Sequence, residues 1–243
     1  CGGGSTAGSG NPNPAPTAST TPTAVDSIVI PLYSYPTGEY ASQWQALYNF
    51  QTNKSVYVIV NPSNGPGTSP DPNFTDAIAT LQSKNFKALG YVDTNYANNS
   101  LPSVESQIDE WFSFYPNING IFLDNVNPNN YTYYASLYNY IKAKNQSYLV
   151  VLNPGANIDT SFFKIADKII VYEGSYQNFL GYNYTYFQEP SSDVCIIITG
   201  TPSQNDFYEA QSHGFSINSS CQYITNYSGS SEYYYVSSYL SLY

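Results

Sequence analysis

Short apolar runs alternate with amphipathic stretches along most of the chain. The runs are continuously apolar and rich in Val and Ile, as expected for strands that are buried on both faces. They predict eight strands, at 27–33, 55–60, 86–92, 118–123, 148–152, 168–172, 194–199 and 222–225.

Each run is followed by a stretch that reads as a helix, although the sixth is short and weakly patterned. These stretches lie at 39–50, 73–84, 102–115, 131–144, 159–166, 175–180, 204–213 and 233–240. Eight strand–helix units predict an α/β fold, a single (β/α)8 TIM-type barrel over residues 27–243. The pattern alone leaves an open, doubly wound sheet as an alternative. However, no Gly-x-Gly-x-x-Gly follows the first strand to support a dinucleotide-binding fold.

The first 26 residues contain almost no large apolar side chain and consist mainly of Gly, Ser, Thr, Pro and Ala. This composition predicts a flexible, disordered linker. The chain begins with Cys1, followed by three glycines and Ser5, a pattern typical of a lipoprotein whose cysteine carries the lipid. The alternative is an arbitrary chain boundary. Because no run is long and apolar enough to span a bilayer, the membrane contact that we expect is only through a lipid on Cys1.

Charged residues make up 10% of the chain, and the formal net charge is −10. This balance argues against a nucleic-acid partner, because no basic stripe could neutralise phosphates. It is compatible with a cationic partner such as a polymer with free amines, or it serves solubility alone. We expect no cofactor and no metal. The one His, His213, lies late in a predicted helix, and the cysteines lack zinc-site spacing.

Cys195 and Cys221 fall on neighbouring predicted strands, where we expect a disulfide; two buried free thiols are the alternative. The chain also carries eight Asn-x-Ser/Thr sequons, compared with about five expected by chance from its composition. Together with the linker, these features indicate an extracellular protein, secreted or held at the cell surface, and a glycoprotein.

Candidate chemistry follows the strands, since the active site of a β/α barrel lies at the carboxyl ends of its strands. Asp124 and Glu173 each follow a strongly apolar run, where an unused carboxylate would be costly to desolvate. Asp93 follows the third strand and could instead cap the next segment. Two strands apart, Asp124 and Glu173 can approach to about 5 Å, the spacing of retaining glycosidases.

Tyrosines and amides surround these acids in the predicted barrel. Tyr rings stack on the apolar faces of sugars, and amide groups bond their hydroxyls. The residues expected to bind substrate are Tyr33, Asn61, Tyr91, Asp93, Tyr96, Asn125 and Asn153. The pattern therefore predicts a polysaccharide partner and a glycoside hydrolase.

Several strings at these strand ends together resemble the spherulin-4 (spherulation-specific) family. They are IPLYSYP at 30–36, VIVNPSNGPG at 58–67, LGYVDTNY at 89–96, GIFLD at 120–124, VLNPG at 151–155 and VYE at 171–173. The resemblance extends from about residue 28 to the end of the chain.

The resemblance implies a β/α barrel and a retaining, endo-acting hydrolase of α-1,4-linked galactosamine or N-acetylgalactosamine in extracellular polysaccharide. It also implies that Asp124 is the nucleophile and Glu173 the acid/base. Family members often carry Asp-Glu after the fourth strand, whereas this chain carries Asp124-Asn125. If that second acid is essential, the chain is a non-catalytic carbohydrate-binding protein. A structural or adhesive coat protein is a further alternative.

Overall fold

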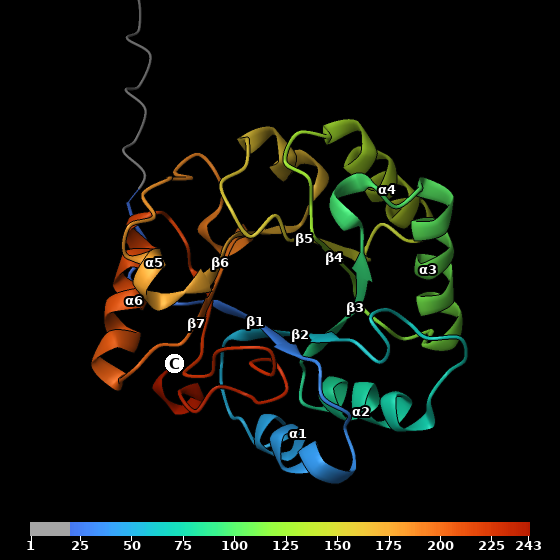
Figure 1. The fold of residues 1–243 in the computed structure, drawn as a ribbon, viewed down its shortest axis with the longest axis horizontal. Helices are drawn as coiled ribbons and strands as arrows, with labels where there is room; N and C mark the ends of the chain where they lie inside the picture. The colour runs from blue at the N-terminus through green and yellow to red at the C-terminus, as the bar shows by residue number, and fades with distance from the viewer. Residues whose placement is uncertain (1–19) are drawn as a thin grey trace, which may run out of the picture.

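In the computed structural model, eight parallel strands close into a barrel in the order in which they occur in the chain (Figure 1). The strands are β1 (Ser27–Leu32), β2 (Ser55–Val60), β3 (Lys87–Asp93), β4 (Gly120–Asp124), β5 (Leu149–Leu152), β6 (Lys168–Ser175), β7 (Val194–Thr199) and β8 (Cys221–Ile224). The predicted fold class is therefore confirmed. The structure describes residues 20–243, so Cys1 and most of the predicted linker lie outside the described residues.

Helices surround the ring of strands (Figure 1). The α-helices are α1 (Ala41–Tyr48), α2 (Pro72–Ser83), α3 (Leu101–Phe114), α4 (Tyr131–Lys144), α5 (Tyr176–Phe179) and α6 (Gln204–Ser216). The 3-10 turns are η1 (Gly38–Tyr40), η2 (Asn95–Ala97), η3 (Thr160–Ile165), η4 (Ser191–Asp193) and η5 (Leu240–Leu242). Four of the long helices begin at a capping side chain that accepts a backbone N–H of the first turn. The caps are Asp71, Ser100, Asn130 and Ser203.

The contact between α3 and β3 illustrates how the core orients the site. Trp111 of α3 is fully buried over Gly90, where a Cβ atom would collide with the indole ring. Its Nε1 donates to the carbonyl of Tyr91 at 2.8 Å. Packing and hydrogen bonding therefore fix the strand that carries Tyr91 and Asp93.

Three of the predicted helices differ in the structure. The segment at 159–166 forms the 3-10 turn η3, and 175–180 forms only the single turn α5. The prediction of a helix at 233–240 is wrong, because this segment consists of turns that end in η5. Its backbone donors bond elsewhere: the N–H of Val236 to Gln43 Oε1 at 3.0 Å, and that of Ser237 to Tyr223 OH at 2.9 Å.

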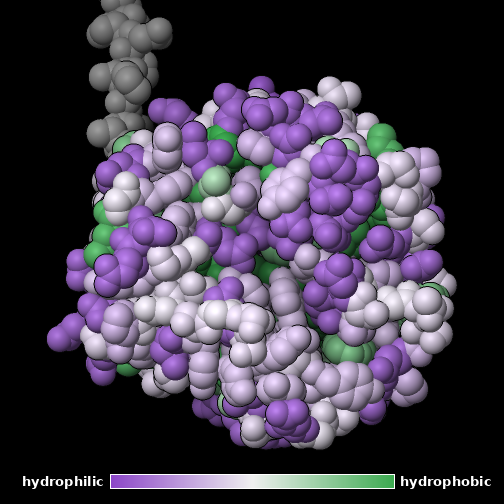
Figure 2. Space-filling view, viewed as in Figure 1, coloured by the Kyte–Doolittle hydropathy of each residue, from purple (hydrophilic) through white to green (hydrophobic). Residues whose placement is uncertain are grey.

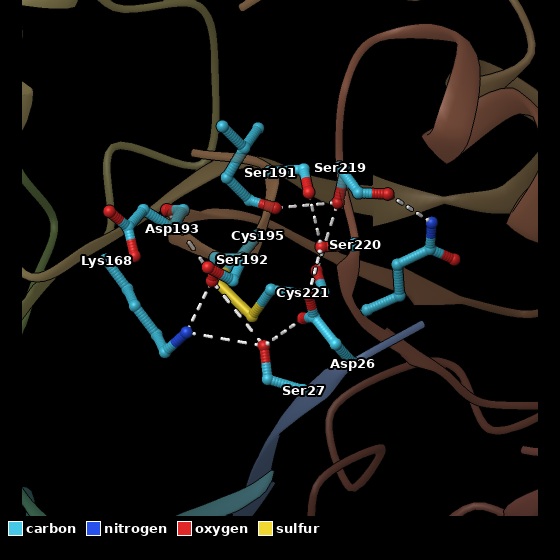
Figure 3. The surroundings of a disulfide bond; sticks show 12 residues. Asp26, Ser27, Lys168, Ser191, Ser192, Asp193, Cys195, Ser219, Ser220 and Cys221 are labelled. Atoms are coloured by element: carbon cyan, nitrogen blue, oxygen red, sulfur yellow. Dashed lines mark hydrogen bonds between the residues drawn. A yellow bond between two sulfur atoms is a disulfide. The ribbon is translucent and has the colours of Figure 1, made fainter. Parts of the chain in front are cut away.

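A disulfide joins β7 and β8 where the two strands begin (Figure 3). Cys195 and Cys221 are paired in the strand register and are both fully buried. Nearby, Lys168 Nζ donates to the carbonyl of Ser192 and, at 3.3 Å, to Ser27 Oγ. These contacts tie together the amino ends of β1, β6, β7 and β8.

The barrel begins slightly earlier than the sequence boundary at residue 27. Val25 is 3% exposed and belongs to the core, and Asp26 Oδ2 accepts from Ser220 Oγ at 2.9 Å. Both residues therefore pack with the barrel and not with the linker.

The surface is polar. Figure 2 shows a face on which hydrophilic residues predominate and hydrophobic ones appear in separate patches. Within residues 20–243, no helix combines the length and the apolar character needed to cross a membrane.

Candidate active site

Asp124 and Glu173 meet at the carboxyl ends of the strands, on either side of β5. Asp124 is the last residue of β4, and Glu173 lies near the end of β6, which is longer than predicted. Asn153 follows β5, and its Nδ2 donates to Asp124 Oδ1 at 2.8 Å and to Glu173 Oε1 at 2.9 Å. The two accepting oxygens therefore lie within about 5.7 Å of each other. This limit is close to the carboxyl spacing of retaining glycosidases, about 5–5.5 Å, and below that of inverting ones.

Two tyrosines hold the other oxygens of the pair. Tyr91 OH donates to Asp124 Oδ2 at 2.6 Å, and Tyr233 OH donates to Glu173 Oε2 at 2.5 Å. The ring of Tyr33 lies between them, with its centroid 5.5 Å from each of the other two rings in edge-to-face contact. Each carboxylate is thus fixed at both oxygens, which is the preorganisation that acid–base or nucleophilic chemistry needs.

Burial and the nearby charge of Glu173 raise the pKa of Asp124 to about 6, although hydrogen bonds from Tyr91, the Asn125 backbone and Asn153 oppose the rise. Two carboxylates this close resist ionising together. As pH rises, the pair therefore keeps one proton until about pH 6. Burial, followed by the carboxylate charges, raises the pKa values of Tyr91 and Tyr233. Both phenols therefore remain protonated donors.

The loops after β3 and β4 bond each other and hold the backbone of Asp124 in place. Thr94 Oγ1 donates to the carbonyl of Asp124 at 2.8 Å and lies 2.8 Å from Tyr134 OH. Asn125 has a left-handed backbone, with φ of 51°, and its Nδ2 donates to Asp93 Oδ1 at 2.9 Å. Asp93 Oδ1 also accepts the N–H of Asn95 at 2.8 Å, so this acid both caps its own loop and pairs with Asn125.

Tyr96 lies in an unusual turn after β3. Asn95, Tyr96 and Ala97 have φ values of 46°, 57° and 68°, which form a short left-handed turn. Such a backbone is costly for residues with a Cβ and is often found where function requires it. The Tyr96 side chain is 52% exposed, which leaves its ring available to a ligand.

The remaining predicted residue, Asn61, has a structural contact of its own. Asn61 Oδ1 accepts the N–H of Gly65 at 2.8 Å and thereby closes the loop after β2. It lines a cavity beside Tyr33 and Tyr233 and forms no hydrogen bond with either acid of the pair. Tyr33, Tyr91 and Asn153 are thus gathered with the two acids, Asp93 joins Asn125 beside them, and Asn61 lies to one side.

Sequence reasoning missed Tyr233. It comes from the segment after β8, 60 positions from Glu173, and is brought to the site by backbone pairing of Tyr33 N with its carbonyl at 2.7 Å. Nothing marks this residue among the 27 tyrosines of the chain. Its segment lies beside β1 in Figure 1.

The described residues contain no group of three or more His, Cys, Asp or Glu side chains placed to hold a metal ion. His213 lies in the last turn of α6, with Nε2 2.6 Å from the carbonyl of Tyr182.

Residues 27–242 match the family model described as spherulation-specific family 4, Spherulin4. The chain belongs to this family. The site therefore lies in a spherulation-specific family 4 domain that includes almost the whole barrel.

A curated relative is Spherulin-4 of Physarum polycephalum, which is 33% identical over 155 residues. The match covers 62% of this chain and 46% of the relative, so the chain spans less than half the length of that family 4 protein.

Among solved structures, the fold is similar to that of Aspergillus clavatus Sph3, crystallised in complex with GalNAc. The TM-score is 0.75 at 23% identity, and the match covers 90% of this chain and 96% of that chain. At this identity the likeness supports the barrel fold of family 4.

Proposed function

We propose that this protein is a glycoside hydrolase that cleaves an α-linked galactosamine or N-acetylgalactosamine polysaccharide, with Asp124 and Glu173 as its catalytic pair. The observation that carries the proposal is the Asn153 amide, which donates to both carboxylates and keeps the accepting oxygens within about 5.7 Å, a limit compatible with the spacing of a retaining enzyme. The complex of Sph3 with GalNAc supports the choice of sugar.

In the first step, Asp124 attacks the anomeric carbon while Glu173 protonates the departing glycosidic oxygen. The carbon–oxygen bond to the leaving sugar breaks, and a glycosyl ester on Asp124 forms. In the second step, Glu173 takes a proton from water, which attacks the same carbon and releases Asp124. The raised pKa of Asp124 allows the resting pair to hold the single proton that this cycle needs.

The surrounding side chains suit a sugar chain. Tyr96 offers an exposed ring for stacking on a pyranose face. Asp93 and Asn125 lie beside Asp124 at the end of paired strands and can bond sugar hydroxyls. No cofactor takes part in the proposed reaction.

Asn125 favours one alternative function. It stands where the resemblance to the family leads us to expect an acid after Asp124, and its amide donates to Asp93. If the missing carboxyl is needed for turnover, the same site acts as a non-catalytic carbohydrate-binding site at the cell surface.

We also infer that the protein works outside the cell, either secreted or surface-anchored. The Cys195–Cys221 disulfide supports this inference, because disulfides persist in oxidising compartments. Lipid attachment to Cys1 stays a prediction.

The proposal is tested by the release of reducing ends from α-1,4-linked galactosaminoglycan, both acetylated and deacetylated. We expect turnover by the wild type and a loss of about 10²–10⁴-fold in kcat for Glu173→Gln, the usual contribution of general acid–base catalysis. Glu110→Gln, on α3 away from the pair, serves as the matched control and retains full activity.

Tight sugar binding by the wild type without release would favour the binding-protein alternative. Equal activity of Glu173→Gln and wild type would remove Glu173 from the catalytic pair.

A further inference from the structure

All basic side chains of this protein lie toward one end of the barrel. The seven are lysines, each at the start of a strand, just before one, or at the C-terminal end of a helix. They are Lys54, Lys84, Lys87, Lys142, Lys144, Lys164 and Lys168. In a barrel of parallel strands these positions share the amino end, opposite the active site.

The carboxyl end carries the opposite charge. Asp93, Asp124 and Glu173 lie at strand ends there, and Asp71 and Asp206 lie at the starts of α2 and α6. Within residues 20–243, no Lys or Arg lies at this end of the barrel. A ligand that approaches the site therefore meets a uniformly negative field, which attracts cations and repels anions.

A cavity of about 460 Å³ opens at this end, next to the acid pair. It lies between the loops after β1 and β2 and the segment after β8. Tyr33 and Tyr233 form the wall shared with the active site, since Tyr233 bonds Glu173 directly. The volume is within the usual range for small-molecule sites, about 300–1,000 Å³.

Glu232 provides the charge of this cavity. Its carboxylate is half-buried and forms no hydrogen bond or ion pair with another side chain in the part of the chain that the structure describes. Burial, and then the charge of Glu173, raise its pKa, although a hydrogen bond from the Gly229 backbone opposes the rise. A carboxylate in this position would be stabilised by a cationic ligand, and no lysine is near enough to serve.

The other walls of the cavity suit a sugar. Tyr234 is 40% exposed and offers a ring face, and Asn61 and Asn64 offer amide groups. Because Asn61 Oδ1 already accepts from Gly65, its Nδ2 is left to donate to a ligand.

We infer that this cavity is a sugar-binding subsite for a residue that carries a protonated amine, with the Glu232 carboxylate as its counter-ion. The subsite lies next to the point of cleavage and selects deacetylated over N-acetylated sugar at that position. The inference rests on the proposed function for its polysaccharide ligand.

The test measures binding of α-1,4-linked galactosamine and N-acetylgalactosamine oligosaccharides by calorimetry. It uses a Glu173→Gln background, so that no ligand is consumed. Adding Glu232→Gln is expected to lower the affinity ratio of deacetylated to acetylated ligand about fivefold, as for a partly exposed ion pair. The preference should also weaken as salt is raised. Glu110→Gln, added in the same background, leaves the ratio unchanged.

An unchanged ratio, or no binding of either ligand, overturns the subsite. Reducing-end release by the wild type is measured separately, so the two ideas fail independently. A wild type that does not cleave but shows the Glu232-dependent ratio refutes the hydrolase and keeps the subsite. If the wild type cleaves both polymers and Glu232→Gln leaves the affinity ratio unchanged, the hydrolase is supported and the subsite is refuted.

Discussion

Asn153 is the residue on which the geometry of the acid pair depends. Its side chain is 4% exposed, and one amide nitrogen serves both Asp124 and Glu173. The N–H of Asn153 donates to the carbonyl of Leu123 at 2.9 Å, which ties the loop after β5 to β4. The backbone of Asn153 is therefore fixed by the barrel, and its buried side-chain nitrogen positions the two carboxylates.

Tyr91 tunes the proton held by the pair. Its hydroxyl stabilises the ionised form of Asp124, so Tyr91→Phe raises the pKa of Asp124 above about 6. Because the active pair must retain one proton, the alkaline limb of the kcat/KM profile should move upward by about one pH unit. Tyr140→Phe, which removes a hydroxyl bonded to Asp109 on the outer surface, should leave the profile in place. A limb that moves downward would contradict the assigned hydrogen bond.

The same raised pKa makes Asp124 a cost to stability. Its folded-state pKa lies above the unfolded value, so its contribution is favourable below about pH 4 and is lost as pH rises through about 6. At pH 7 the free energy of unfolding of Asp124→Asn should therefore exceed that of the wild type by about 1–3 kcal/mol, and its melting temperature should be higher. At pH 4 the two proteins should differ little.

Asp109→Asn is the matched control with the opposite sign. Although burial alone would raise the pKa of Asp109, hydrogen bonds from Lys144 and Tyr140 lower it. This substitution should lower the melting temperature at pH 7. Melting temperatures of both variants, measured at several pH values, test these expectations. An Asp124→Asn variant that is less stable than the wild type at pH 7 would refute the claim that Asp124 destabilises the fold.

At the scale of elements, the loops after β3 and β4 hold their residues in strained conformations. Ala97 has φ of 68°, which glycine adopts without a Cβ penalty. Ala97→Gly should therefore stabilise the protein by about 0.5–1 kcal/mol. Ala79→Gly, at an exposed position in α2, should instead destabilise it by about 1 kcal/mol. Denaturant unfolding measures both, and a destabilising Ala97→Gly would show that the turn is not strained.

The strands were predictable because buried strands consist of apolar residues, which stand out in the sequence. In β1 and β7 all six residues are buried, so each appears as an uninterrupted apolar run. Asp124 and Glu173 could be located for the same reason, since each carboxyl interrupts the apolar character of its strand.

The segment after β8 was not predictable in this way. Its Tyr-rich sequence resembles an amphipathic helix. In the structure, however, the Tyr233 hydroxyl bonds Glu173, and the backbone near Val236 donates to side chains of distant elements. These are long-range contacts without a local signal. The contribution of this segment to the site, including Glu232, therefore required the structure.

At the scale of the whole molecule, the lysines lie toward one end of the barrel, where acids such as Asp167 and Asp109 pair with them, while among the described residues the other end carries acids alone. Lysines gather at the amino ends of the strands, where Lys168 lies above the ring of Tyr57 at 4.9 Å from its centroid. Acids without basic neighbours gather at the carboxyl end. This arrangement suits a polymer with positive charges and leaves the pair of Asp124 and Glu173 without a lysine partner in the described residues.

The most direct test of the central claim is the stereochemistry of the product. Proton NMR in the first minutes of the reaction identifies the anomer released from α-linked substrate, before mutarotation mixes the forms. A nucleophilic Asp124 held close to Glu173 predicts that the α-anomer appears first. Initial release of the β-anomer would contradict the account, because it would mean a single displacement by water and no covalent step on Asp124.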